Sequence, residues 1–356
     1  MRNWLDILEV KLRNYLSKLR GLRRPLTNDL FERILYISPD NVRITNYIRR
    51  KPLAIFNPGA VVDGDGLLIF PRLVFDYYWY VSSIGLFKLG LSSLGTNEVL
   101  SEVINTKVIL YPTSKYEVVR GCEDPRVTSI NGKYYVFYTA VGPKPLPHYT
   151  PEVISDMPLY RASYQGLAIL DEGFNLIRKY YLKLGDEVLP NWKDGALVRS
   201  SKDYLVMLLR PSLRGIEANW SGLVKLSDFS IDLSSLEPVM VCEDWEYKIG
   251  WSTNTVKLGS NEYLVGWHAV LKSDFSYVNG LAVVSDEGEL LGTTDYVLTP
   301  RGINEVYGDR PHVVFGCGLV LHKEYLIWVG GISDYGICVF RTELSKVLES
   351  IRWFKG

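Results

Sequence analysis

Apolar residues recur at two different spacings along the chain, one at the N-terminus and another over the rest. Within residues 1–25 the apolar positions follow helical spacing, and Gly21 and Pro25 supply stop signals. Beyond residue 40 the pattern changes to short apolar runs separated by turn residues, which is typical of strands. The sequence therefore predicts an N-terminal amphipathic helix over 1–25 and an all-β domain over 40–350.

The polar face of the predicted helix is mainly basic. The basic positions are Arg2, Lys11, Arg13, Lys18 and Arg20, against Asp6 and Glu9. Such a helix can pack on its own domain, contact a second subunit or lie on a membrane surface. Packing or subunit contact is the favoured interpretation, and it allows a homo-oligomer formed through this helix.

One unit recurs five times beyond residue 40: a polar or glycine-bearing turn, an apolar run and then a polar residue. The runs cover residues 65–72, 131–139, 202–210, 260–268 and 323–331. The polar residues are Arg72, Thr139, Arg210, His268 and Asp334, spaced 67, 71, 58 and 66 residues apart. Four short strands fit such a period, so the sequence predicts a five-bladed β-propeller whose strand ends meet around a central channel. Two unrelated sandwich domains are the alternative, but they do not predict the even spacing.

Composition narrows the range of functions. Lysine plus arginine equals aspartate plus glutamate at 40 each, so bulk charge favours neither nucleic acid nor an acidic surface. The four cysteines are far apart and there are only four histidines, so neither a metal site nor a disulfide framework is expected. The sequence has no run of eighteen apolar residues and no signal-peptide pattern, so we expect no membrane span and a cytoplasmic location.

Aromatic residues suited to stacking on sugars are plentiful, with 24 tyrosines and nine tryptophans. We expect some of them to line the rim of the channel: Tyr77, Tyr78, Trp79, Tyr80, Trp192, Trp245 and Trp251. The proline-rich stretch from Pro143 to Pro158 is too long for a plain hairpin, and we expect it to overhang the channel.

The tract Glu123-Asp124-Pro125-Arg126 directly precedes one of the repeated runs. Alternation along a strand predicts that Asp124 and Arg126 point together while Glu123 points away. Pro125 keeps Asp124 out of the right-handed helical region and so presets its direction. An ordinary ion pair on a strand gives the same pattern.

Several cationic and neutral donors stand where surface charge is not expected. Arg210 and His268 end long apolar runs, and Lys248 and Tyr277 lie close to them in the sequence. Together these groups would suit an oxyanion.

Two carboxylates and an amide complete the candidate residues. Asp194 and Asp334 can accept hydrogen bonds from sugar hydroxyls or cap turns, and Asn57 before Pro58 can offer an amide or belong to a turn.

These motifs together resemble glycoside hydrolase family 130, the β-mannoside phosphorylases and their hydrolytic relatives. The resemblance runs from about residue 40 to 345. It rests on Asn57-Pro58, Glu123-Asp124-Pro125-Arg126, Tyr134-Tyr135, Lys193-Asp194, Leu209-Arg210-Pro211, Lys248-Ile249-Gly250, Trp267-His268, Glu305…Gly308 with Val313-Val314-Phe315, and Gly330-Gly331…Asp334.

The resemblance implies an inverting phosphorylase that cleaves β-mannosides with inorganic phosphate, its co-substrate, to give α-mannose 1-phosphate. Asp124 matches the proton donor of the family, thought to act through a hydroxyl of the bound mannose. The phosphate-binding positions match Arg210, Lys248, His268 and Tyr277. The substrate-binding positions match Asn57, Arg72, Arg126, Lys193, Asp194 and Asp334. No metal or further cofactor is expected.

Two other functions remain open, a hydrolase on the same scaffold and a non-catalytic sugar-binding propeller. Hydrolytic relatives are expected to carry extra carboxylates where phosphate would bind, whereas this sequence keeps cations. One departure from the family stands beside the Lys193-Asp194 pair: Trp192 replaces an arginine found in many members, so one phosphate ligand is lost or replaced.

Overall fold

The structure is a computed structural model that describes residues 4–95, 98–100, 102–145 and 160–354. It is mostly β, with one long helix near the N-terminus, α1 (Trp4–Leu19). The mostly β architecture with an N-terminal helix is therefore confirmed. The predicted overhang from Pro143 to Pro158 falls mainly on residues outside the described part.

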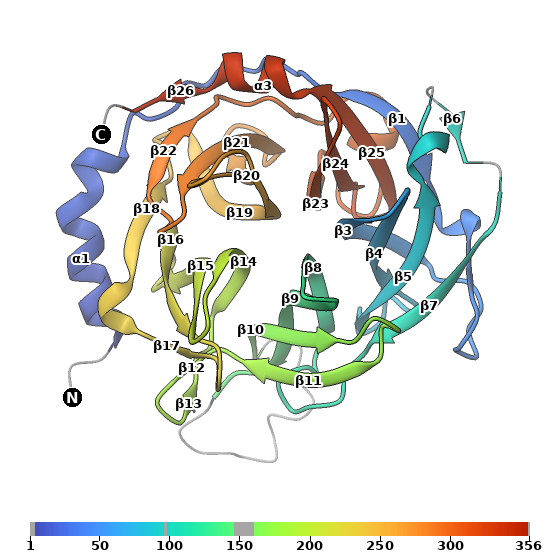
Figure 1. Cartoon of the computed structure of the whole chain (residues 1–356), viewed down its shortest axis with the longest axis horizontal. Coiled ribbons are helices and arrows are strands. Elements are labelled where there is room, and N and C mark those ends of the chain that lie inside the picture. The colour runs from blue at the N-terminus through green and yellow to red at the C-terminus, as the bar shows by residue number, and fades with distance from the viewer. Residues whose placement is uncertain (1–3, 96–97, 101, 146–159, 355–356) are drawn as a thin grey trace.

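Twenty of the strands form five antiparallel units of four strands each, arranged in a ring (Figure 1), and units 1 and 2 share one sheet through the pairing of β5 with β8. Unit 1 contains β3 (Ala54–Asp63), β4 (Gly66–Val74), β5 (Ser82–Gly90) and β7 (Ile104–Leu110). Unit 2 contains β8 (Gly121–Ile130), β9 (Lys133–Pro143), β10 (Arg161–Leu170) and β11 (Leu176–Tyr181). Unit 3 contains β14 (Trp192–Ser200), β15 (Tyr204–Leu213), β16 (Ile216–Lys225) and β18 (Glu237–Val241).

Unit 4 contains β19 (Glu246–Lys257), β20 (Glu262–Leu271), β21 (Tyr277–Ser285) and β22 (Leu290–Thr293). Unit 5 contains β23 (Val314–His322), β24 (Tyr325–Ile332), β25 (Gly336–Glu343) and the early strand β1 (Glu32–Ile37). The N-terminal strand thus completes the last unit. The remaining strands and α-helices are β2 (Val42–Ile44), β6 (Glu98–Val99), β12 (Lys183–Leu184), β13 (Glu187–Val188), β17 (Ser230–Ile231), β26 (Arg352–Trp353), α2 (Ile303–Val306) and α3 (Leu344–Ser350).

Apolar side chains hold neighbouring units together around the whole ring. One buried cluster joins each pair of consecutive units, and a further cluster joins unit 5 back to unit 1. In that closing cluster Ile55 and Ile69 of unit 1 pack with Val329 and Val339 of unit 5. Two interactions therefore close the ring: the burial of apolar surface between units 5 and 1, and the pairing of β1 with β25.

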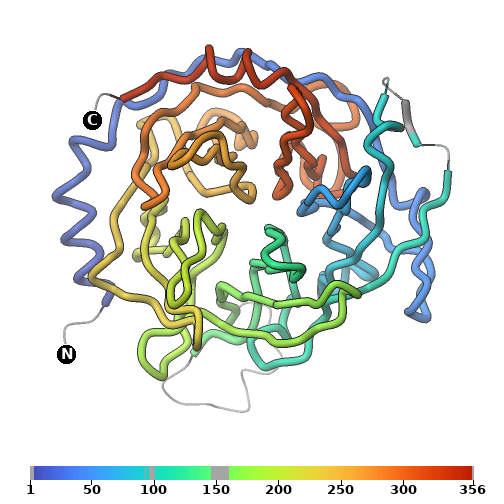
Figure 2. The backbone as a smooth tube through the Cα atoms, in the orientation of Figure 1, coloured from blue at the N-terminus to red at the C-terminus, as the bar shows by residue number. Residues whose placement is uncertain are grey.

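The five repeated runs of the sequence fall on the second strand of each unit: β4, β9, β15, β20 and β24. The first strand of every unit lies nearest the centre of the ring (Figure 2), and each of these strands carries a β-bulge. A bulge places two residues against one and redirects side chains. In units 1, 2 and 3 the bulge contains Asn57, Asp124 and Asp194, each with a positive φ between 46° and 57°.

The helix α1 packs on its own chain. Leu8 and Leu12 are buried in the apolar cluster between units 2 and 3, and Trp4 contacts the ring of Trp192 at 5.6 Å. Trp192 therefore belongs to the core under the helix, and the expectation that it lines the rim is wrong; Trp251 is buried as well. In the part of the chain that is described, none of the helices has the length and apolarity needed to cross a membrane.

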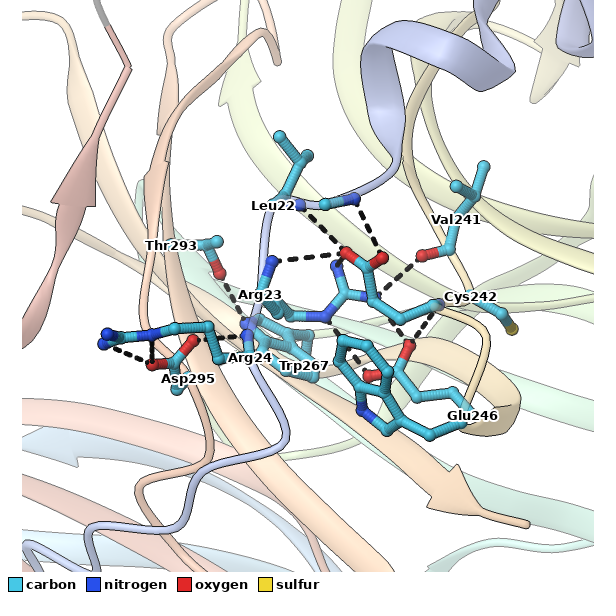
Figure 3. A network of polar contacts seen from close by, with 12 residues as sticks. Leu22, Arg23, Arg24, Val241, Cys242, Glu246, Trp267, Thr293 and Asp295 are labelled. Atoms are coloured by element: carbon cyan, nitrogen blue, oxygen red, sulfur yellow. Dashed lines mark hydrogen bonds and ion pairs between the residues drawn. The ribbon is translucent and has the colours of Figure 1, made fainter.

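The helix ends at Leu19, so residues 20–25 of the predicted 1–25 helix are not helical, and Arg23 anchors them (Figure 3). The buried Arg23 guanidinium donates to both oxygens of Glu246, at 3.2 and 2.6 Å, and lies 4.9 Å from the ring of Trp267. The carboxylate of Glu243 accepts the backbone N–H groups of Gly21, Leu22 and Arg23. This network fixes the N-terminal segment to unit 4.

Candidate active site

Polar side chains from all five units surround one cavity of about 710 Å³. Ten of the eleven residues predicted for the site line it: Asn57, Arg72, Asp124, Lys193, Asp194, Arg210, Lys248, His268, Tyr277 and Asp334. The five residues that end the repeated runs, including Thr139, are all among its walls. The eleventh predicted residue, Arg126, lies behind the wall and is 1% exposed.

Asp124 projects into the cavity from the bulge in β8. Its Oδ1 accepts hydrogen bonds from Asn57 Nδ2 at 2.9 Å and from Arg72 Nη1 at 3.1 Å. The proline after Asp124 and the proline after Asn57 exclude the right-handed helical region, and both residues adopt left-handed conformations instead. Asparagine and aspartate tolerate that conformation better than most residues, which suits the sequence to the geometry.

Glu123 also faces the cavity, so the prediction that it points away from Asp124 is wrong. Its Oε1 lies 2.8 Å from Arg72 Nη2, beside the contact of Asp124 with the other terminal nitrogen. The bulge between Glu123 and Arg126 breaks the strict alternation on which the prediction rested. Burial raises the pKa of Glu123, and the neighbouring Asp124 carboxylate adds to that effect.

Arg72 joins the two carboxylates and is itself held by its surroundings. Its Nε donates to Ser82 Oγ at 2.8 Å, and its guanidinium lies 4.8 Å from the ring of Phe56 and 5.5 Å from that of Tyr80. All of its contacts fix the plane of the guanidinium. Arg72 therefore orients the acidic side of the cavity.

Asp194 forms the centre of a buried ion-pair network in unit 3, next to unit 2 that carries Asp124. Its Oδ1 is 3.1 Å from Arg126 Nη2, and its Oδ2 is 2.8 Å from Arg210 Nε. Burial alone would raise the pKa of Asp194, but Arg210, Arg126 and Lys193 outweigh burial and hold that pKa well below its usual range. Gly250 permits this packing, because a Cβ there would lie 2.8 Å from both Asp194 Oδ2 and His268 Nε2.

Lys193 and Lys248 line the same side without a carboxylate of their own. Among the described residues neither ammonium forms an ion pair or a hydrogen bond, whereas Arg210 is paired with Asp194 and with Glu217 at 3.1 Å. The positive charge of Arg210, followed by burial, lowers the pKa of Lys193. Burial, followed by Arg210, lowers the pKa of Lys248. Cations that are crowded together, with depressed pKa values, favour the binding of an anion between them.

His268 and Tyr277 complete this basic side. Their rings are stacked with centroids 5.6 Å apart, and His268 Nδ1 lies 3.0 Å from Ser252 Oγ. Burial lowers the pKa of His268 well below its usual range, so the imidazole is neutral at neutral pH. Burial raises the pKa of Tyr277, so its phenol keeps its proton. Both groups can then act as neutral hydrogen-bond partners.

Asp334 faces Arg72 from unit 5, and burial raises its pKa to about 6. Because that pKa exceeds the ordinary 3.8, ionisation of Asp334 disfavours the folded state as pH rises from about 4 through 6. We expect Asp334→Asn to increase the free energy of unfolding by about 2 kcal/mol at pH 7.5 and by little below pH 4. Urea denaturation of both proteins across that pH range measures the difference, and a difference independent of pH would contradict the argument.

The sequence argument missed several residues of the cavity wall. Arg310 lies 4.5 Å over the ring of Tyr277, and Asp309 accepts a hydrogen bond from the Tyr80 hydroxyl at 3.2 Å. Both stand in the segment between units 4 and 5, which follows no strand period. Arg120, Arg161 and Glu123 also line the cavity. The described residues contain no group of three His, Cys, Asp or Glu side chains placed to hold a metal ion.

Comparison with known families shows which family the chain belongs to. The sequence pattern of the family described as β-1,4-mannooligosaccharide phosphorylase, glycoside hydrolase family 130, matches residues 21–352. The chain therefore belongs to glycoside hydrolase family 130, which contains mannoside phosphorylases and also glycoside hydrolases. Among curated proteins no relative matches the chain.

Solved structures agree on the fold. The β-1,2-mannobiose phosphorylase from Listeria innocua is 18% identical, with a TM-score of 0.65, over 91% of this chain and 97% of that chain. A glycosyl hydrolase from Bacteroides ovatus is 14% identical, with a TM-score of 0.60, over 85% of this chain and 86% of that one. A family 130 structure from work on hydrolases that target β-1,2-mannosidic linkages in Candida mannan is 13% identical, with a TM-score of 0.60, over 82% of this chain and 85% of that one. These likenesses establish a shared fold.

Proposed function

We propose that this protein is an inverting phosphorylase that cleaves β-mannosides with inorganic phosphate and releases α-mannose 1-phosphate. The observation that supports the proposal is a pair of ammonium groups in the cavity wall, Lys193 and Lys248, which form no ion pair with a carboxylate among the described residues. An inorganic phosphate between them and Arg210 would relieve the repulsion that depresses their pKa values. Membership of a mannoside phosphorylase family supports the same reaction.

In the proposed mechanism, phosphate bound by Arg210, Lys248, His268 and Tyr277 attacks the anomeric carbon. The bond from that carbon to the departing oxygen breaks, and its electron pair stays on the oxygen. Asp124 supplies the proton to that oxygen through a hydroxyl of the bound mannose. Phosphate is already an anion, so no second carboxylate is needed to activate the nucleophile, unlike in inverting hydrolysis.

The other site residues would hold the sugar. We assign Asn57, Arg72 and Asp334 to the mannose hydroxyls, because they surround Asp124 at the cavity wall. We assign Lys193 to the phosphate side, whereas Asp194 in the wall and Arg126 behind it would act through their neighbours. The Arg126 guanidinium donates to the Asp124 carbonyl at 2.8 Å and pairs with Asp194. Arg126 and Asp194 would therefore position the proton donor and Arg210.

A hydrolase on the same scaffold is the second candidate, and Glu217 is the observation that favours it. Glu217 Oε2 lies 3.1 Å from Arg210 Nη1 and neutralises part of the cationic side. A carboxylate there could activate a water in place of phosphate. Glu217 is absent from the cavity wall, however, whereas both lysines are part of it.

The deciding experiment incubates the protein with β-1,2- and β-1,4-linked mannobiose, with and without inorganic phosphate. Phosphorus and proton NMR then identify the released sugar and its anomeric configuration. The proposal expects α-mannose 1-phosphate and strict dependence on phosphate. Free mannose released at the same rate without phosphate would establish hydrolysis instead.

We also infer that the five units are the blades of a five-bladed β-propeller spanning residues 40–350, with 1–25 as an extension. The antiparallel four-stranded units and the closing pair of β1 with β25 support this description. The buried side chains Leu8 and Leu12 of α1 pack on the same chain. A homo-oligomer formed through the other side of α1 stays a prediction. The cytoplasmic location likewise stays a prediction.

A further inference from the structure

A second groove of about 580 Å³ continues outward from the catalytic cavity. Tyr77 and Asp309 belong to the walls of both hollows, so the groove and the cavity meet there. Farther out, the groove is lined by Tyr36, Tyr307 and Tyr335. We call this set of five residues the tyrosine groove.

The tyrosine groove opens where unit 5 meets unit 1. Tyr77 follows β4 of unit 1, Tyr335 follows β24 of unit 5, and Tyr36 lies on β1 of the same unit. Lys193 and Arg210 belong to unit 3, which lies across the ring from that junction (Figure 1). The groove therefore begins on the side of the cavity away from these cations.

The chemistry of the groove suits neutral sugar rings. Tyr77, Tyr307 and Tyr335 are 42%, 77% and 42% exposed, so their ring faces are available. Asp309 is the one ionisable carboxylate of the groove wall, and the described wall has no lysine, arginine or histidine. An anionic ligand would find no counter-charge there, whereas sugar C–H faces stack on tyrosine and sugar hydroxyls bond to its phenol.

A chain of contacts links the groove to the reacting centre. Tyr77 stacks on Tyr80 with centroids 5.7 Å apart, and the Tyr80 hydroxyl donates to Asp309. The Tyr80 ring in turn lies 5.5 Å from the Arg72 guanidinium, which holds Asp124. A sugar unit in the groove would thus be next in line to a mannose held at Arg72.

We propose that the tyrosine groove binds the departing part of a β-mannoside chain, so that the protein prefers oligosaccharides longer than two units. This inference rests on the proposed function. In an inverting displacement the departing sugar leaves on the face opposite the nucleophile. Lys193 and Arg210, two of the cations proposed to hold phosphate, belong to unit 3 across the ring from the groove, so the departing chain would extend away from them into the groove.

The test measures binding without turnover, in the Asp124→Asn background, by isothermal titration calorimetry. The ligands are mannobiose and mannopentaose of the β-1,2 and β-1,4 series. We expect the pentaose of one series to bind at least about tenfold more tightly than its biose, and Tyr307→Ala to reduce that gain by about three- to tenfold. Tyr307 is the most exposed ring of the groove, so its removal should leave the core intact.

Tyr78→Ala is the matched control. Tyr78 neighbours Tyr77 in the sequence and is 86% exposed, but it lines a separate groove that shares no wall residue with the cavity. The Tyr78→Ala variant should keep the full increase in affinity from the biose to the pentaose. Equal affinity for biose and pentaose, or an equal loss in both variants, would overturn the inference while leaving the proposed function in place. Light scattering that shows a lower mass for Tyr307→Ala, with the gain intact, would assign the surface to a subunit contact and overturn it too. Failure of every mannoside to bind would overturn both proposals.

Discussion

Replacing Asp124 by Asn should reduce phosphorolysis by on the order of a thousandfold, because general acid catalysis contributes about 10² to 10⁴ to a rate. Asparagine keeps the size of the side chain and its oxygen can still accept from Asn57 and Arg72. It also tolerates the left-handed conformation at φ 50°. Mannoside binding should therefore survive while proton donation is lost. Initial rates give the loss of turnover, and calorimetry gives the retained affinity.

Glu123 offers the sharpest comparison for this experiment. It contacts the same guanidinium as Asp124, and burial raises its pKa, so it is a second carboxyl group beside Asp124 that could hold a proton. Glu123→Gln should cost much less activity than Asp124→Asn. The reverse order would transfer the role of acid to Glu123. As a matched control, Asp63→Asn changes an exposed ion pair with Lys88 at 3.2 Å and should leave the rate unchanged.

The repeat of the second strands was readable because each one is a buried run bounded by turn residues. Arg72, Arg210 and His268 end such runs, and a charged or polar group there has no ordinary place except a shared interior. In a ring of equivalent units that interior is the axis. Sequence spacing alone therefore indicated which side chains meet around one cavity.

The direction of Glu123 could not be read in the same way, because alternation assumes an unbroken strand. The bulge in β8 adds a residue at the point where Glu123 and Asp124 stand, and both then face Arg72. Pro125 signalled an unusual backbone at Asp124. It did not indicate that the register shifts there, since that shift depends on the pairing with β9.

Two of the residues that the sequence argument missed come from a connection between units. Arg310 and Asp309 lie in a segment without periodic pattern, and their place depends on how unit 5 packs on unit 1. Trp192 shows the opposite error. Its aromatic ring suited a sugar-binding rim, but the helix α1 covers it through Trp4. Such contacts between distant segments cannot be inferred from local spacing.

Replacing Lys248 by Met should raise the phosphate concentration needed for half-maximal rate by about ten- to a hundredfold. Loss of one charge-assisted contact costs roughly 1.5 to 3 kcal/mol, and methionine keeps the apolar length of the side chain. The KM for the mannoside should stay near its original value, because Lys248 stands on the side of the cavity away from Asp124 and Arg72. Initial rates at varied phosphate and saturating mannoside measure the effect.

Lys248 tests the phosphate site more cleanly than Arg210 does. Arg210→Ala should also weaken phosphate binding, but it removes a partner from both Asp194 and Glu217 and so leaves buried carboxylates poorly compensated. Lys248 has no such partner among the described residues, so its loss should weaken phosphate binding without lowering stability. Lys257→Met, at the exposed end of the same strand β19, is the control. Unchanged phosphate dependence in Lys248→Met would remove this ammonium from the anion site, and a rise confined to the mannoside KM would place it against the sugar.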